Sequence, residues 1–118
     1  MNPEEFFAGY PISYDFYEGV RQAIEAIGPA EIRVTKSQVA FWHRKPFARL
    51  WMPEQYLKRE AAPLVLTLGF NLRNLSPRWK SVIEPAPGLF THHLELYSAA
   101  DIDDEVRQWL REAWEMAG

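Results

Sequence analysis

Residues 35–52 read TKSQVAFWHRKPFARLWM, and this stretch combines strand-forming apolar residues with cationic side chains more densely than any other part of the chain. Two apolar runs, 39–42 and 47–52, suit a pleated, half-buried surface. Pro46 lies between them, and because proline has no N–H for a ladder hydrogen bond, it favours a turn or a sheet edge at this point. The stretch predicts two neighbouring strands of a sheet.

The segments on either side of this stretch show helical and strand periodicity. Apolar residues recur every three or four positions from residue 12 to residue 27, which predicts a helix that ends at Gly28. Alternation of apolar and polar residues predicts further strands over 31–35, 64–72, 79–84 and 90–97. Ser98 is the expected N-cap of a closing helix, and acidic residues gather in its first turn. The polar residues 53–63 are expected to form a loop, with one helical turn in which Glu54 precedes Lys58 by four positions.

These elements predict a single α+β domain over residues 1–118. We expect an N-terminal helix, a mainly antiparallel sheet of about five or six strands and a C-terminal helix, with the helices in a single layer on one sheet face. Short connections between successive strands favour hairpins over parallel crossovers. Strand 64–72 is expected to turn its leucines, Leu72 included, towards the core.

The composition is that of an ordinary soluble protein, with 47% hydrophobic and 25% charged residues in 118. The sequence contains no cysteine, which excludes disulfides, thiol catalysis and cysteine-ligated zinc. No apolar run approaches the ~20 residues that span a bilayer, and the acidic N-terminus does not resemble a signal peptide. We therefore expect a cytoplasmic protein with no membrane partner.

Charge is segregated along the chain. The net formal charge is −5 over residues 1–31, +7 over residues 32–93 and −5 over residues 94–118, which sums to −3. Acidic helices that pair with a basic sheet explain this distribution, and so does a sheet face that binds an anion. The sequence leaves both interpretations open.

Four ordered motifs, TKSQVAFWHRKPFARLW, LTLGFNLR, PRWKSVIE and THHLELYSAADIDDEVRQWLREAWE, resemble the bacterial domain-of-unknown-function family 5655. The resemblance extends from about residue 7 to residue 117. It implies no established activity, and no residue inherits a role from it. The resemblance associates the family with nucleic-acid work only indirectly, through zinc-binding segments and neighbouring nuclease-type domains among its relatives. This chain differs from those relatives in having no cysteine.

Two adjacent histidines are expected to serve different purposes. His92 and His93 point to opposite faces of a strand, so they cannot bind one metal ion together. His92 shares a face with leucines and is expected to be a hydrogen-bonded core residue. His93 shares a face with Glu95, which leaves open a small hydrolase or transferase that uses this pair. His43 is expected to be a solvated loop residue.

The leading interpretation is a non-enzymatic binding module, although the sequence leaves open whether the chain is an enzyme. Its basic, aromatic sheet face would bind an anionic partner, either a nucleotide-like small molecule or single-stranded nucleic acid, through arginine forks and tryptophan stacking. The alternative from another class is a homo-oligomeric protein-interaction domain, such as a homodimer, in which Trp42, Trp51 or nearby apolar residues form the contact. No catalytic residue, metal site or cofactor is predicted. The expected ligand-binding residues are Lys36, Arg44, Arg49, Trp51, Arg73, Arg78, Lys80 and His93.

Overall fold

The computed structural model of the protein describes residues 1–55 and 61–118. Within these residues, six strands form one sheet in the order β1-β2-β3-β4-β6-β5, and every neighbouring pair is antiparallel. The strands are β1 (Glu31–Val34), β2 (Val39–Trp42), β3 (Pro46–Trp51), β4 (Leu64–Phe70), β5 (Ser81–Ala86) and β6 (Leu89–Leu96).

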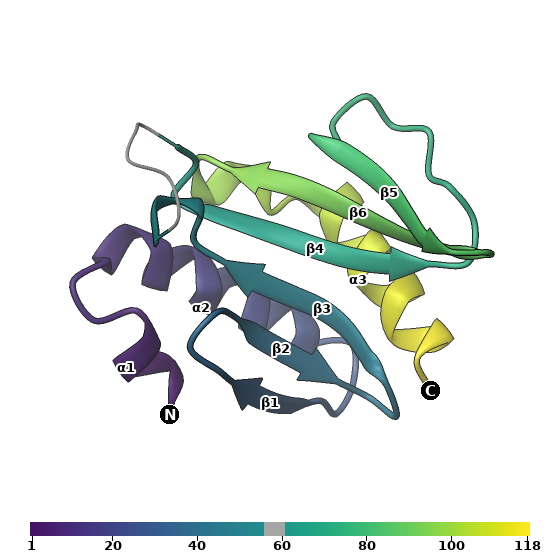
Figure 1. Cartoon of the computed structure of the whole chain (residues 1–118). Helices are drawn as coiled ribbons and strands as arrows, with labels where there is room; N and C mark the ends of the chain where they lie inside the picture. The colour runs from purple at the N-terminus through teal and green to yellow at the C-terminus, as the bar shows by residue number, and fades with distance from the viewer. Residues whose placement is uncertain (56–60) are drawn as a thin grey trace.

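Helices cover one face of this sheet. The long helices α2 (Pro11–Glu25) and α3 (Asp104–Met116) lie side by side behind the strands, and the short helix α1 (Pro3–Phe6) precedes them (Figure 1). Two single 3-10 turns, η1 (Pro53–Gln55) and η2 (Ala99–Asp101), complete the described elements. The predicted α+β architecture, a mainly antiparallel sheet of about five or six strands with helices on one face, is confirmed.

Local chemistry explains where the helices begin. Asn2 and Glu5 form a reciprocal capping box at the start of α1. Asp103 begins α3, because its carboxylate accepts a hydrogen bond from the Val106 N–H at 3.0 Å. The prediction that Ser98 caps the closing helix was therefore wrong: Ser98 precedes η2, and α3 starts after a second acidic cap.

The core lies between the helices and the inner face of the sheet. On β4 and β6 the alternation predicts the faces correctly, since the leucines on the inner face are buried. Leu64, Leu66, Leu68 and Leu96 are fully buried, and Leu94 is nearly so. The inner face of β2 and β3 and the apolar stripes of the helices supply the remaining core: Val39, Phe41, Ala48, Leu50, Phe16, Tyr17, Val20, Ile24, Val106, Trp109, Leu110 and Ala113.

Two sequence predictions fail near the end of β4. The strand stops at Phe70, and Leu72 is 77% exposed in the following loop rather than in the core. The next strand begins at Ser81, two residues later than predicted. Trp79 belongs to the preceding loop, where its ring packs against that of Trp109 with the centroids 4.2 Å apart. The expected Glu54–Lys58 pair lies partly outside the described residues.

An extra residue in β3 bends the sheet. Phe41 pairs with Ala48 but Trp42 pairs with Pro46, so Phe47 has no partner on β2. Such a β-bulge places two successive side chains towards the same side and increases the local bend. Phe47 and Ala48 are accordingly both in the core cluster, and β3 pairs with β4 only from Ala48 onward.

Candidate functional site

The face of the sheet opposite the helices, here called the open face, carries a row of residues that crosses all six strands. Successive Cα partners in this row run from β1 to β5. Adjacent strands are ~4.8 Å apart, so the row brings together residues that are far apart in sequence. Its members are Arg33, Ala40, Arg49, Thr67, His93 and Ser81.

A chain of hydrogen bonds connects three residues of the open face. The Trp51 indole Nε1–H donates to Thr67 Oγ1 at 3.0 Å, and Thr67 Oγ1 lies 2.8 Å from His93 Nδ1. Thr67 is only 4% exposed, so its hydroxyl proton needs a protein acceptor, and His93 Nδ1 fills that role. We call this set the Trp51–Thr67–His93 relay.

The relay determines which nitrogen of His93 carries the proton. If Nδ1 were protonated, it would donate to Thr67 and leave the buried Thr67 hydroxyl proton without its acceptor, at a cost of about 1–3 kcal/mol. The neutral tautomer with the proton on Nε2 is therefore favoured. Burial lowers the pKa of His93 below its usual value of 6.5, which also keeps the ring neutral at neutral pH.

His93 Nε2 is free to meet a ligand. No described residue pairs with Nε2, and His93 lines a cavity of about 550 Å³ on the open face. Ligand pockets commonly enclose ~300–1,000 Å³. The walls of this cavity, here called the open-face pocket, are Trp51, Pro53, Ala61, Val65, Lys80, Ser81, Ile83, His93, Glu95 and Tyr97.

The open-face pocket combines an apolar wall with charged groups of both signs. Val65 and Trp51 supply apolar and aromatic surface. Lys80 Nζ lies 3.9 Å from Glu95 Oε1, and the Lys80 side chain is 65% exposed. Such a long, solvated ion pair contributes little stability, so both groups remain able to bind a ligand. With Nε2 protonated, His93 is a donor rather than a general base, which disfavours hydrolysis by His93 and Glu95.

The structure brings some predicted ligand-binding residues together. Trp51, Lys80 and His93 line the open-face pocket. Arg49 lies on the same face beside Thr67, two strands from His93 and outside the pocket wall. In the described part of the chain Arg49 forms no ion pair.

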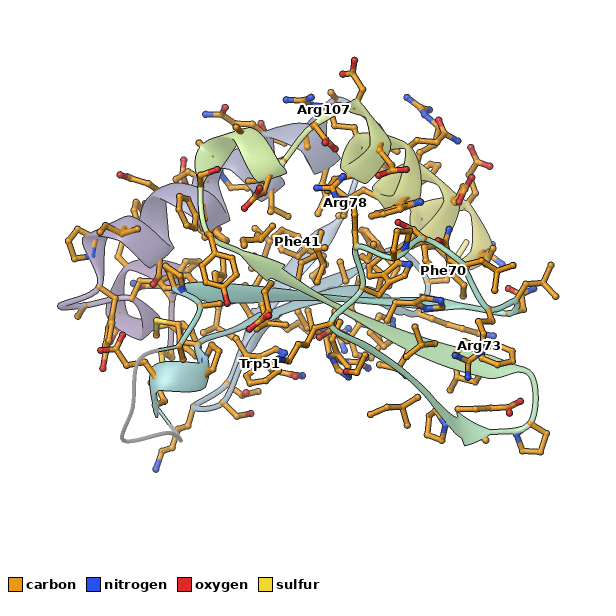
Figure 2. The ribbon with its side chains drawn as sticks, turned by 90° about the horizontal axis from the view of Figure 1, so that it is seen from above. Phe41, Trp51, Phe70, Arg73, Arg78 and Arg107 are labelled. Atoms are coloured by element: carbon orange, nitrogen blue, oxygen red, sulfur yellow. The ribbon has the colours of Figure 1, made fainter. Side chains whose placement is uncertain are left out.

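The other predicted residues lie elsewhere. Lys36 is in the turn between β1 and β2, and Arg44 is in the turn between β2 and β3. Arg73, in the loop after β4, lies with its guanidinium 5.7 Å from the Phe90 ring. Figure 2 shows Arg78 on the helix side of the sheet and Trp51 on the open side.

Arg78 has a structural environment. Its guanidinium donates to Asp103 at 3.0 Å, to Glu105 at 2.9 Å and to the backbone carbonyl of Asp101 at 3.0 Å. The two carboxylates raise the pKa of Arg78 against the opposing effect of burial. Arg78 thereby connects the loop before β5 to the start of α3. This contact is of the kind expected if the acidic helices pair with the basic residues of the sheet region.

His92 is a core residue, as predicted. It is fully buried, Nε2 accepts a hydrogen bond from the Asn74 N–H at 2.9 Å, and Nδ1 lies 3.1 Å from the Phe90 carbonyl oxygen. These partners require the proton on Nδ1, the opposite tautomer to that of His93. Burial is the main cause that lowers its pKa.

Sequence reasoning missed Thr67, although the alternation in 64–70 places it on the outer face. The sequence feature that could have identified Thr67 is that it is a lone threonine at the centre of an apolar strand. Its partners could not be identified without the register that sets β4 between β3 and β6. The same register brings Ser81 opposite His93.

The described residues contain no group of three or more histidines and carboxylates arranged to hold a metal ion. Among them there is also no helix with the length and apolar character needed to cross a membrane.

Comparisons with known proteins identify the family. Neither the comparison with curated proteins nor that with solved structures gives a match. A family model described as "Domain of unknown function (DUF5655)" matches residues 4–117, nearly the whole chain, and includes every residue of the relay and the open-face pocket. This extent confirms the resemblance seen in the sequence, and the chain belongs to the DUF5655 family.

Proposed function

We propose that this protein is a binding module for a small anionic ligand with a planar ring, a nucleotide-like molecule, and that the open-face pocket is its site. The observation that carries the proposal is the Trp51–Thr67–His93 relay, which holds a neutral N–H donor at a cavity that also contains an ammonium group. A fixed donor beside an exposed cation suits a ligand with an acceptor atom and a negative charge.

Each part of such a ligand has a complementary group. Lys80 attracts the anionic group, and His93 Nε2–H donates to a ring or carbonyl acceptor. Glu95 accepts from an amino substituent, and Trp51 offers aromatic surface to the ring. The pocket can thus distinguish a nucleotide-like molecule from an inorganic anion, which has no ring to contact Trp51 and no amino group to donate to Glu95.

A small ligand suits the charge distribution better than single-stranded nucleic acid does. A strand-binding groove needs cations along its length. Here Arg33 pairs with Glu31 and is stacked 3.8 Å from the Trp42 ring, and Arg78 is on the other side of the sheet. Few unpaired cations of the described residues remain on the open face.

Backbone amide NMR titration with adenosine monophosphate tests the proposal. We expect shifts at Trp51, Val65, Ser81 and His93, and binding that weakens as salt is raised. Lys80→Gln should weaken binding about fivefold, the loss of one solvated charge-assisted hydrogen bond of ~1 kcal/mol. Lys36→Gln, which removes an exposed lysine that does not line the pocket, should leave binding unchanged.

Two results would contradict the proposal. If adenosine monophosphate at millimolar concentration leaves the pocket amides unmoved, the pocket does not take this class of ligand. A short oligothymidylate that shifts residues across the whole open face and competes with the mononucleotide would instead favour single-stranded nucleic acid.

A further inference from the structure

The sheet divides at one end. β3 and β4 pair only from Ala48–Leu68 to Trp51–Val65. Beyond this point β4 continues to pair with β6 as far as Phe70–Phe90, and β3 continues to pair with β2 as far as Pro46. The bulge at Phe47 starts this separation, and Figure 1 shows β3 and β4 diverging there with the end of α3 behind the gap. We call this region the sheet fork.

One branch of the fork is fastened to the end of α3. The Arg44 and Lys45 N–H groups both donate to the Ala117 carbonyl, at 2.9 and 3.1 Å. His43 Nδ1 lies 2.9 Å from the Trp114 carbonyl oxygen, and its ring stacks on Trp114 with centroids 3.9 Å apart. His43 is therefore not the solvated loop residue that was predicted. These contacts hold the β2–β3 hairpin against the helix and away from β4.

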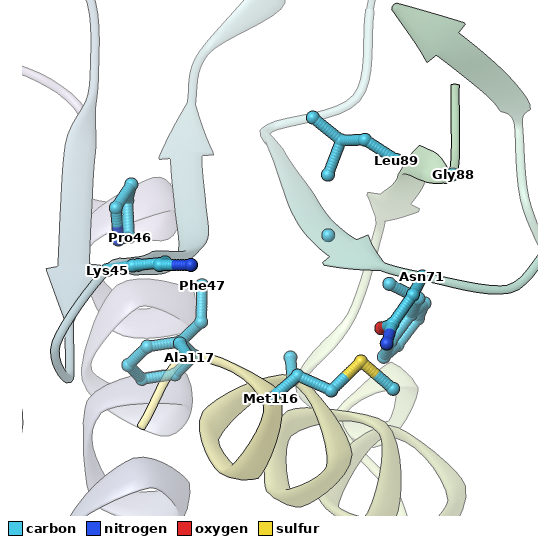
Figure 3. Close-up of a pocket in the computed structure, with 11 residues that line it drawn as sticks. Lys45, Pro46, Phe47, Asn71, Gly88, Leu89, Met116 and Ala117 are labelled. Carbon is cyan, nitrogen blue, oxygen red and sulfur yellow. The ribbon is translucent and has the colours of Figure 1, made fainter. Parts of the chain in front are cut away.

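A cavity of about 280 Å³ occupies the fork (Figure 3). The buried residues Phe47, Phe70 and Ala113 form part of its lining. Leu89 and Met116 also line it, and they are 47% and 46% exposed. At ~30 Å³ for each water-sized group, the cavity holds a ligand of about nine or ten non-hydrogen atoms.

The polar groups of the fork carry one sign of charge. Lys45 lines the cavity, and in Figure 3 its ammonium end is directed towards the space between the two branches. Lys45 forms no ion pair with a carboxylate of residues 1–55 or 61–118, and Arg44 beside it forms none either. The Asn71 side chain, on the opposite branch, has no hydrogen-bond partner within those residues and can donate through its amide.

We propose that the sheet fork is a second binding site, for a small carboxylate with an apolar body. The apolar body would lie against Phe47, Phe70 and Met116, and the carboxylate would meet Lys45 and the Asn71 amide. This assignment is independent of the open-face pocket, which lies at the other end of the β3–β4 ladder. It gives a role to Lys45, which does not line the open-face pocket.

Octanoate is the probe that tests this site, with octylammonium as the probe of equal chain length and opposite charge. In an amide NMR titration we expect octanoate to shift Lys45, Phe47, Gly69, Asn71 and Ala117, and octylammonium to leave them unmoved. Lys45→Gln should weaken octanoate binding about five- to tenfold, the loss of one charged hydrogen bond. Lys36→Gln should not change it.

Met116→Ser provides a second test, because it removes apolar surface and leaves every charge in place. It should also weaken octanoate binding, and since both Lys45 and Met116 are exposed, both variants should fold. Equal binding by the wild type, Lys45→Gln and Met116→Ser would overturn the proposal. So would equal binding of octylammonium, or octanoate shifts confined to Trp51 and His93, which would place this probe in the open-face pocket.

Discussion

Thr67→Val removes the central hydroxyl of the relay and nearly preserves the shape of the side chain. The Trp51 Nε1–H and His93 Nδ1, at 3.0 and 2.8 Å from Thr67 Oγ1, both lose their partner. Each hydrogen bond contributes ~1 kcal/mol net, and a polar group left buried without a partner costs ~1–3 kcal/mol. Because His93 and Trp51 reach a solvated cavity, we expect water to restore part of this loss. The predicted decrease in the free energy of unfolding is about 2–3 kcal/mol, a large fraction of the ~5–15 kcal/mol typical of a domain.

Urea denaturation measures this change, and Thr67→Ser is the matched control. Serine keeps the hydroxyl and loses one methyl group, which costs ~1 kcal/mol when buried. We therefore expect Thr67→Val to be clearly less stable than Thr67→Ser. Equal stability of the two variants would show that the hydroxyl makes no net contribution, and the relay would lose its energetic basis.

Side-chain nitrogen NMR tests the same relay directly. In the wild type above pH 7 we expect His93 to carry its proton on Nε2 and His92 to carry its proton on Nδ1. Two adjacent residues of one strand then give opposite patterns in one spectrum, so each is the internal control of the other. In Thr67→Val, His93 should become a mixture of tautomers while His92 is unchanged. A wild-type His93 protonated on Nδ1 would refute the assignment of the donor at the open-face pocket.

Two further predictions concern stability. Burial lowers the folded-state pKa of both His92 and His93 below 6.5. As the pH falls, these two histidines therefore become protonated at a higher pH in the unfolded chain than in the folded protein. Stability should be fully present above pH ~6.5 and should fall as the pH drops towards the folded-state pKa values, by at most ~1.4 kcal/mol per pH unit for each histidine. Urea denaturation at several pH values from 7.5 to 5.5 measures this loss of stability. His93→Gln should reduce the slope of the free energy of unfolding against pH. A free energy of unfolding that does not change over this range would contradict the prediction. Arg78→Met should lower the free energy of unfolding by about 1–2 kcal/mol, because a half-buried guanidinium loses two carboxylates and one carbonyl. Arg107→Met removes an exposed ion pair with Asp104 and should change the free energy of unfolding by less than ~0.5 kcal/mol. Equal effects of the two substitutions in denaturation experiments would refute the structural role of Arg78.

The sequence predicts the architecture well because periodicity reports burial. The strict alternation in 64–70 is what a strand needs when one of its faces contacts helices, and it correctly orients Leu66 and Thr67. Helix boundaries are less predictable, because two caps follow each other at the start of α3. Ser98 fits the statistical preference for an N-cap, but the Asp101 carboxylate accepts from the Tyr97 and Ser98 N–H groups and ends that turn. Asp103 then starts the helix.

The candidate site is less accessible to sequence reasoning, because residue type does not determine which side of the sheet a loop residue faces. Arg78 and Lys80 are two positions apart in a basic segment. Arg78 binds the acidic start of α3, whereas Lys80 lines the open-face pocket on the other side. A composition argument assigns both to one basic face. Only the path of the loop, which His92 holds through the Asn74 N–H, separates them.

Both proposed sites depend on side chains that depart from the simplest pattern of a two-layer fold. A threonine between two leucines, Leu66 and Leu68, costs apolar burial on β4. Its hydroxyl is hydrogen-bonded to the Trp51 indole and to the His93 imidazole. At the fork, Phe47 breaks the alternation of β3 and enters the core, which separates two strands that would otherwise pair along their length. Regular strands would close the fork and leave the open face without a fixed donor. The positions at which a pattern-based prediction of this fold fails or is incomplete are therefore the positions that give the sheet surfaces able to recognise a ligand.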